Sequence, residues 1–356
     1  MKRWMAGELD QSLLVVLYRY GPASAGTVIE LAAPQVGHYG YKRLFWLKRH
    51  GLVNVVTYSI PAGKRRRLKR AAIYYLTAPG MRFVLNTQGR ESNAENARPK
   101  PESLEAIYRR SRFLYVLHRE MPDLDIETAR DVRDRYELPN NVLIDLVIDG
   151  DIAVYTPRGD GVKKRQIRWL VNCIDKIAKR GVARHHIIVA RDREHRRKLA
   201  AAMMGRPPIL THILLADQAD LAMEVKQIPS GLKFGLEDVW DRVDVRKSPV
   251  RSGGAPTFTV HTPVTSFHAV DLTTFDLQQV GSVTAFSASQ AQKDGLIPTL
   301  LIAVQTEDDM YDLARLYAPE LVEYLCFAIL DRPVDYRFNR FVHGKLTVIQ
   351  PRRSRS

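Results

Sequence analysis

Residues 37–53 read GHYGYKRLFWLKRHGLV, and this stretch carries the strongest structural signal of the amino-terminal region. Gly40, Leu44 and Leu47 recur at helical spacing and predict the buried face of a helix over about residues 37–50. Gly51 suits the left-handed position that ends a helix. The outward face is then expected to hold cations and aromatic rings, namely His38, Tyr39, Lys42, Arg43, Trp46 and Arg49.

Two shorter helices are expected before this one. Asp10 can cap a helix that ends at the Gly21-Pro22 pair, and Ser24 can cap a second helix that stops before Pro34. The three helices together predict a helix-turn-helix arrangement.

A basic β-hairpin is expected directly after the third helix. Residues 52–60 and 73–76 are rich in β-branched and aromatic side chains. The segment between them carries six cations: Lys64, Arg65, Arg66, Arg67, Lys69 and Arg70. Three helices followed by a hairpin is the order of a winged helix-turn-helix, in which the third helix enters the major groove and the hairpin reaches the backbone or minor groove.

The distribution of charge agrees with a nucleic-acid partner. The chain has 54 Lys and Arg residues against 39 Asp and Glu, a net charge of +15. Residues 1–90 contain 15 basic and 3 acidic side chains, so most of the excess lies in the first quarter. A concentrated positive field of this kind is the electrostatic footprint of phosphate binding.

Composition excludes several other classes of protein. A chain of 356 residues with 45% hydrophobic and 26% charged side chains predicts two or three globular cores and excludes collagen-like or wholly disordered chains. No apolar run approaches the roughly 20 residues of a membrane span, and no secretory signal is evident. Cys173 and Cys326 lack metal or disulfide spacing. We therefore expect a cytoplasmic protein without membrane contact.

The expected fold class is mixed α/β, with four segments along the chain. Residues 1–85 form the winged-helix domain, and residues 86–103 are a polar linker without a large aliphatic side chain. Residues 104–248 form a middle α/β domain. Residues 249–356 form a further α/β region, left open as a part of the middle domain or a separate unit, with a strand at 300–304 and a helix over about 310–330.

The middle domain resembles the core of restriction-endonuclease-like nucleases in its expected order of elements. Helices are predicted at 104–118, 126–136 and 163–179, a hairpin at 142–155 around Asp149-Gly150, and a strand at 186–190. Such nucleases hold a divalent metal ion on an acid in the hairpin and on a Glu-x-Lys sequence in the next strand.

The carboxylates of this chain match that pattern only in part. Asp145, Asp149 and Asp151 can supply the acid, but Ala153-Val154-Tyr155 stands where Glu-x-Lys is required. Glu224-Val225-Lys226 spells the tripeptide elsewhere, so the remaining catalytic candidates are Asp145, Asp151, Glu224 and Lys226. We expect a degenerate nuclease fold with no catalysis, no cofactor and no metal site. Zinc binding by His185, His186 and His195 is disfavoured, because adjacent strand residues point to opposite faces.

Two further basic runs have two interpretations. The first is Lys163, Lys164, Arg165 and Arg168, and the second is Arg191, Arg193, Arg196, Arg197 and Lys198. Each run either widens the DNA footprint or is a solvated helix face.

The amino-terminal region also resembles a known family. Residues 41–53, together with Tyr74-Tyr75-Leu76-Thr77-Ala78-Pro79-Gly80, are similar to the winged-helix segment of the replication-relaxation family of plasmids and conjugative elements. The resemblance covers about 80 residues and extends weakly to residue 200. It implies a role in plasmid replication or conjugation, at an origin where the protein assists a relaxase or replication initiator in the relaxosome. Separately from this resemblance, a homodimer is left open as a further assembly.

Three functions follow from these observations. The first is a non-enzymatic accessory protein that binds specific double-stranded DNA at an origin. The second is a winged-helix transcriptional regulator, and the third is a metal-dependent DNA nuclease.

Overall fold

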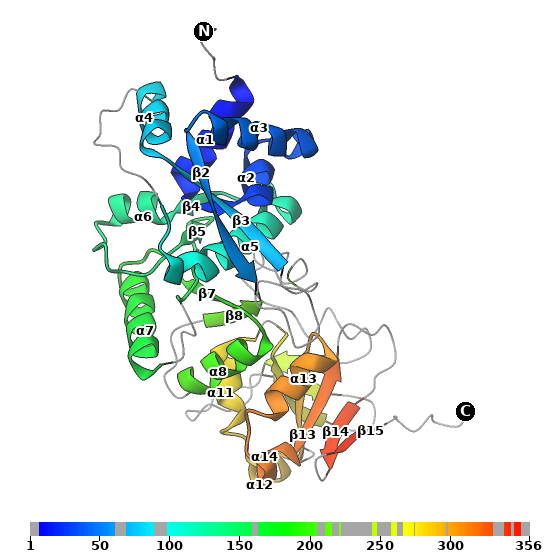
Figure 1. Ribbon diagram of the computed structural model, residues 1–356. Coiled ribbons are helices and arrows are strands. Elements are labelled where there is room, and N and C mark those ends of the chain that lie inside the picture. The colour runs from blue at the N-terminus through cyan, green and yellow to red at the C-terminus, as the bar shows by residue number, and fades with distance from the viewer. Residues whose placement is uncertain are drawn as a thin grey trace, which may run out of the picture.

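The protein has a mixed α/β fold, as expected from its sequence (Figure 1). It is described from a computed structural model over residues 7–60, 69–88, 98–158, 163–204, 211–215, 221, 244–247, 258–261, 266–273, 275–296, 298–329, 338–342 and 345–349. Within these ranges the strands form three sheets.

The amino-terminal part consists of helices around a small antiparallel sheet. The helices are α1 (Glu8–Tyr20), α2 (Ala25–Ala32), α3 (His38–Arg49) and α4 (Ala78–Thr87), with a short 3-10 turn, η1 (Pro34–Val36), before α3. The sheet has the order β1-β3-β2, from β1 (Ala23–Ser24), β2 (Val53–Ile60) and β3 (Lys69–Leu76). The predicted hairpin of β2 and β3 is present, and α4 covers part of the segment expected to be a linker.

Local chemistry explains these helix boundaries. Ser24 caps α2 as predicted, because its side chain accepts a hydrogen bond from the Thr27 amide. Asp10 is not the cap of α1; it lies in the first turn, and its carboxylate accepts a hydrogen bond from the amide of the capping residue Gly7. Gly40 lets α3 approach α2 closely, since a Cβ there would lie 2.8 Å from the Ile29 side chain.

The middle sheet has the order β4-β5-β6-β7-β8. Its strands are β4 (Ile126–Thr128), β5 (Leu146–Ile148), β6 (Ile152–Tyr155), β7 (His185–Ala190) and β8 (Thr211–Leu215). The first three strands pair antiparallel, and β6, β7 and β8 run parallel. Its helices are α5 (Leu104–Glu120), α6 (Ala129–Tyr136), α7 (Lys164–Lys179) and α8 (Arg193–Met203), and η2 (Pro101–Ser103) precedes α5.

The sequence predictions for this part hold with two corrections. The first strand of the hairpin, expected from residue 142, begins only at Leu146, because residues 142–145 are not in a strand. The turn at Asp149-Gly150 is formed with φ of 49° and 65° at the two residues. The predicted helix over 126–136 is wrong at its start, because residues 126–128 pair with β5 as strand β4. Thr128 then caps α6 through a capping box with Asp131, so the chain changes from strand to helix at this residue.

Helix α5 connects the amino-terminal part to the middle sheet. The amide of Ser24 donates to the Ser111 hydroxyl, and the Thr27 hydroxyl donates to the Ser111 carbonyl at 2.9 Å. The Arg110 guanidinium donates to the Pro22 carbonyl at 3.0 Å. The other side of α5 packs on the middle sheet, in a cluster with buried Phe113, Leu117 and several strand residues.

The carboxyl-terminal sheet has the order β15-β14-β13-β12-β11-β10-β9. Its strands are β9 (Asp244–Lys247), β10 (Phe258–His261), β11 (Ser266–Asp271), β12 (Leu300–Val304), β13 (Leu325–Ile329), β14 (Phe338–Val342) and β15 (Lys345–Ile349). From β9 to β13 the pairings are antiparallel twice and then parallel twice, the same series as in the middle sheet.

The helices of this region are α11 (Leu277–Val283), α12 (Ala288–Lys293), α13 (Glu307–Ala314) and α14 (Pro319–Val322). The strand expected at 300–304 is β12. The single helix expected over about 310–330 is wrong: it is divided into α13 and α14, and residues 325–329 form the buried strand β13 beside β12.

One buried cluster contains residues of both the middle and the carboxyl-terminal sheets, among them Ile188, Leu215, Ile302 and Phe327. Helices α8 and α13 meet across this contact, and their charges are opposite. The Arg196 guanidinium, 1% exposed, pairs with Asp309 and with Asp312 and lies 4.2 Å from the Phe275 ring centroid. Among the described helices, none is long and apolar enough to cross a membrane.

Candidate nucleic-acid interface

Helix α3 exposes a broad face of aromatic and basic side chains. Its opposite side is buried through Gly40, Leu44 and Leu47, as the spacing predicts. Tyr39 is 54% exposed and Trp46 is 44% exposed, and neither is part of a core. The predicted residues that share this exposed face are His38, Tyr39, Lys42, Trp46 and Arg49. Burial therefore divides α3 into a packing side and a side that is open to a partner.

The aromatic rings of this face order one of its cations. The Arg49 guanidinium carbon lies 5.2 Å from the Trp46 ring centroid and 6.0 Å from that of Phe45. Trp46 also stacks on the His50 ring, with the centroids 6.0 Å apart. Cation–π contacts at exposed sites are weak, of the order of 0.5–1 kcal/mol, but they restrict the conformations of a long side chain.

Arg43 belongs to a different environment from the one expected. Its Nε donates to Oδ1 of Asp10 at 2.8 Å, and a terminal nitrogen donates to Oδ2 at 2.5 Å. The Asp10 side chain is 1% exposed, and hydrogen bonding to its carboxylate raises the pKa of Arg43. The structure therefore places Arg43 in the contact between α1 and α3, where it neutralises a buried carboxylate.

Three exposed α3 residues were absent from the sequence prediction: Tyr41, Phe45 and Lys48. Phe45 is 56% exposed and Tyr41 is 47% exposed, the values expected of polar side chains. The signal that could have found them is helical spacing, because residues 41, 45 and 48 recur at intervals of four and three outside the Leu44 and Leu47 stripe. Their hydrophobic character favours a core assignment instead.

The hairpin after α3 is described only in part. Strands β2 and β3 pair antiparallel from Val53–Leu76 to Ile60–Lys69, so they form one continuous ladder. Lys69 and Arg70 begin β3, and the Arg70 side chain is exposed. The other four predicted cations of the hairpin, Lys64, Arg65, Arg66 and Arg67, lie outside the described residues.

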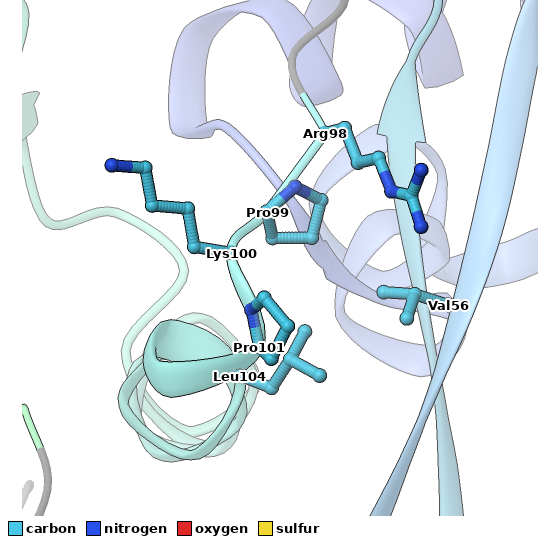
Figure 2. A pocket seen from close by; sticks show the side chains of 6 residues that line it. All are labelled: Val56, Arg98, Pro99, Lys100, Pro101 and Leu104. Carbon is cyan, nitrogen blue, oxygen red and sulfur yellow. The ribbon is translucent and has the colours of Figure 1, made fainter.

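A cavity of about 240 Å³ lies between the hairpin and the start of α5 (Figure 2). Its apolar lining includes Val56 of β2 and Leu104 of α5. The Arg98 guanidinium extends toward the strand that carries Val56, whereas the Lys100 side chain extends away from it (Figure 2). Arg98 and Lys100 are exposed, so the basic surface continues beside the hairpin.

Asp145, the first nuclease candidate, is a structural residue in this fold. Its Oδ2 accepts hydrogen bonds from the Thr156 amide and hydroxyl, both at 2.6 Å. Oδ1 lies 3.7 Å from an Arg110 nitrogen. Nearby, the buried Arg109 donates to the carbonyls of Val189 and Pro157, so an arginine occupies this end of the sheet.

The other two carboxylates of the hairpin lie at its opposite end, after β5 rather than before it. The Asp151 carboxylate binds Arg184 through two hydrogen bonds of 2.7 and 3.0 Å, and this pairing lowers the pKa of Asp151. Asp149 accepts a hydrogen bond from the Asp125 amide at 2.9 Å. The hairpin therefore does not bring Asp145 together with Asp149 and Asp151.

The strand expected to hold Glu-x-Lys is buried. Ala153 and Tyr155 are both 0% exposed, and the Tyr155 hydroxyl lies 2.9 Å from Nδ1 of His186. Burial lowers the pKa of His186 from 6.5 to about 4, so this histidine is neutral at pH 7. A neutral Tyr–His pair occupies the place where the nuclease pattern requires a lysine.

Glu224 and Lys226 lie outside the described residues. Nδ1 of His195 accepts a hydrogen bond from the Arg191 amide at 3.0 Å, and Cys173 and Cys326 are buried and not joined in a disulfide. In the part of the chain that the structure describes, no three His, Cys, Asp or Glu side chains are grouped so that they could hold a metal ion.

Three cations of the second basic run, Arg193, Arg196 and Lys198 of α8, form ion pairs within the chain. Arg193 and Arg196 pair with acidic residues of α13, and Lys198 pairs with Glu194 at 2.6 Å on α8 itself. These charges are compensated within the chain.

No protein-family model, curated protein or solved structure matches this sequence.

Proposed function

We propose that residues 8–87 form a winged helix-turn-helix that binds double-stranded DNA, with α3 in the major groove and the β2–β3 hairpin at the backbone. The observation that carries this proposal is the exposed face of α3, where Lys42 and Arg49 lie among uncovered aromatic rings. An α-helix fits the major groove, and cations and apolar side chains there contact base edges and thymine methyl groups.

The charge of this region supports the same partner. Residues 1–90 carry 15 basic and 3 acidic side chains, and one of the acids, Asp10, is neutralised internally by Arg43. The remaining excess of cations suits the phosphate backbone, where each neutralised phosphate releases counterions.

We propose further that the protein acts without catalysis, as an accessory factor for replication or conjugation. The engagement of Asp145 by Thr156 and Arg110, and of Asp151 by Arg184, supports a middle domain that retains a nuclease-like order of elements as a scaffold. The similarity of residues 41–53 and 74–80 to the replication-relaxation family supports an origin of a plasmid or conjugative element as the target.

Duplex binding is tested by the affinity of the purified protein for DNA as a function of salt. We expect log K to fall linearly with log salt concentration, by about 0.9 for each phosphate contacted. A salt-independent affinity, or no binding to duplex DNA, would contradict the proposal.

The role of α3 is tested by two substitutions with one control. Lys42→Ala and Arg49→Ala are each expected to reduce discrimination between selected and random duplexes by about 1–3 kcal/mol if the side chain reads one base. Arg82→Ala removes an exposed cation of α4 and is expected to leave that discrimination unchanged. Equal reductions for all three variants would show that α3 does not read bases.

The origin role and the absence of catalysis have separate tests. Footprinting on the host element should protect an origin, whereas protection of the protein's own promoter would favour a transcriptional regulator. Incubation with supercoiled DNA and Mg²⁺ or Mn²⁺ should produce no nicking. Nicking that disappears on Asp145→Ala or Glu224→Ala would establish the nuclease function instead.

A further inference from the structure

Helix α7 carries a second concentration of positive charge, far from α3 along the chain. Residues 163–180 contain seven basic side chains and one acidic one, Asp175. The remainder of the chain after residue 90 has more acidic than basic residues. In Figure 1, α7 lies at the left edge of the molecule and α3 at the upper right. The two basic regions are therefore separate surfaces.

The apolar side of α7 is buried, and this packing keeps the basic side of the helix turned toward solvent. Ile167, Leu170, Cys173, Ile174 and Ile177 are buried against the core that the middle and carboxyl-terminal sheets share. The cations lie on the solvent side, where Lys163, Lys164, Arg165, Arg168, Lys176 and Lys179 are exposed. Packing thus presents six cations along α7 and its capping residue Lys163, over a helix about 24 Å long at 1.5 Å per residue.

Within the described part of the chain, these cations differ from those of the neighbouring elements in their lack of acidic partners. On α8, Arg196 pairs with Asp309, and at the start of β7, Arg184 pairs with Asp151. Among the described residues, no carboxylate forms an ion pair with the six exposed cations of α7. A surface that serves only for solubility normally mixes both signs of charge. The α7 face is therefore suited to an extended anionic partner.

Trp169 identifies the kind of anion. The Trp169 side chain is 42% exposed. It lies on the same side of the helix as Arg165, Asn172 and Lys176, because residues 165, 169, 172 and 176 are three or four positions apart. Cations that follow a phosphate backbone, combined with an aromatic ring on which a base stacks, are the features of surfaces that bind single strands. In a duplex the bases are already stacked on one another and are not available to a ring on a convex helix face.

We propose that the outward face of α7 is a second nucleic-acid-binding surface, which takes single-stranded DNA through its six exposed cations and Trp169. This surface is separate from α3, and the proposal stands whether or not α3 reads duplex DNA. A protein with both surfaces can hold a duplex site and an adjacent unpaired strand together.

The test uses the full chain and two probes: a labelled 20-nucleotide oligothymidylate, which does not pair with itself, and a random 20-base-pair duplex. The variant Arg165→Gln/Arg168→Gln/Lys176→Gln is expected to bind the oligothymidylate about tenfold or more weakly. Its salt slope should fall by about 2, because each single-strand phosphate that is no longer neutralised lowers the slope by about 0.7. Affinity for the duplex should change less than threefold.

The matched control is Arg119→Gln/Arg184→Gln/Lys198→Gln, which removes three exposed cations that have acidic neighbours. It is expected to bind both probes almost as the wild type does. Trp169→Leu should weaken oligothymidylate binding about fivefold or more without changing the salt slope, because stacking releases no counterions. Equal affinities of the α7 and control variants for oligothymidylate would overturn the proposal, and a larger decrease on the duplex would overturn the single-strand assignment.

A measurement on the unmodified protein guards against loss of folding in the variants. Lysine acetylation with and without oligothymidylate should show protection of Lys164, Lys176 and Lys179, but not of Lys198. Full reactivity of all four lysines in the complex would contradict the proposal.

Discussion

At the scale of single residues, the pairing of Arg43 with Asp10 changes the interpretation of helix α3. Arg43 lies within the basic run of α3, yet its guanidinium is bound by a carboxylate that is 1% exposed. A buried charge without a partner is costly, because desolvation is not offset by an interaction of opposite sign. Arg43 therefore contributes to the attachment of α3 to α1 rather than to base contacts.

Arg43→Ala should lower the free energy of unfolding by about 2–4 kcal/mol, because Asp10 is left buried without its counter-charge. Urea unfolding measures this decrease. Lys42→Ala, its exposed neighbour on α3, should change the free energy of unfolding by less than about 0.5 kcal/mol. The reverse ranking of the two variants would contradict the structural role of Arg43.

His186 makes stability dependent on pH. Its pKa in the folded protein is about 4, below its ordinary 6.5, so the unfolded chain binds a proton that the folded chain excludes. The contribution of His186 is complete above pH 6.5 and decreases as the pH falls from 6.5 to 4, by about 3 kcal/mol in total. His186→Asn keeps an acceptor for the Tyr155 hydroxyl and should flatten this part of the profile measured by urea unfolding. The exposed control His38→Asn should retain the wild-type slope.

At the scale of elements, the exposed face of α3 offers two kinds of contact to the duplex that we propose as its partner. Four aromatic residues of this helix, Tyr39, Tyr41, Phe45 and Trp46, are at least 44% exposed. The Arg49 guanidinium lies over the rings of Phe45 and Trp46, and the Arg43 guanidinium is hydrogen-bonded to Asp10. The helix is thus richer in apolar contact surface than in free guanidinium groups, which favours contact with thymine methyl groups over bidentate guanine recognition.

This reasoning predicts a preference for thymine over uracil. Alternating poly(dA-dT) and poly(dA-dU) have the same charge and the same hydrogen-bonding groups, and they differ only in the methyl group. We expect about threefold to tenfold tighter binding to poly(dA-dT), since one buried methyl group contributes about 0.8 kcal/mol. Phe45→Ala should remove most of the difference, and Arg82→Ala should retain it. Equal affinity of the wild type for both polymers would exclude methyl recognition by α3.

At the scale of the whole molecule, buried polar contacts join the three sheets. Helix α5 bonds to the amino-terminal part through Arg110 and Ser111, and α8 meets α13 through Arg196 and Asp309. Burial raises the pKa of the Asp309 carboxyl, but the charges of Arg196 and Arg193 outweigh it and hold this pKa below its ordinary value. The contact between the middle and carboxyl-terminal sheets thus depends on a charge pair as well as on apolar burial.

Arg196→Ala should destabilise the protein by about 2–4 kcal/mol, because it leaves the buried Asp309 and Asp312 with only the partly exposed Arg193 as counter-charge. Lys198→Ala removes an exposed pair on the same helix and should cost at most about 1 kcal/mol. Thermal and urea unfolding measure both. If Arg196→Ala cost no more than Lys198→Ala, the network would not hold the two sheets together.

The sequence by itself determined the parts of this protein in which local signals agree with one another. The spacing of Gly40, Leu44 and Leu47 predicted which side of α3 is buried, and the Asp149-Gly150 pair predicted the turn of the middle hairpin. The buried strand after α7 followed from its run of apolar residues. These features depend on neighbours a few residues apart, so periodicity and turn chemistry suffice to predict them.

Only the tertiary structure decided what depends on residues far apart in the chain. The short strand β4 exists because residues 126–128 pair with β5, and β13 replaces a predicted helix because β12 lies beside it. Arg43 and Arg196 are basic in sequence but paired in space, since the carboxylates that bind them lie 33 and 113 residues away. The cations of α7 remain without an acidic partner within the described residues. The sequence pattern does not distinguish a cation that is paired from one that is not. The free energy of a charge depends on which groups the fold brings to within a few ångströms of it.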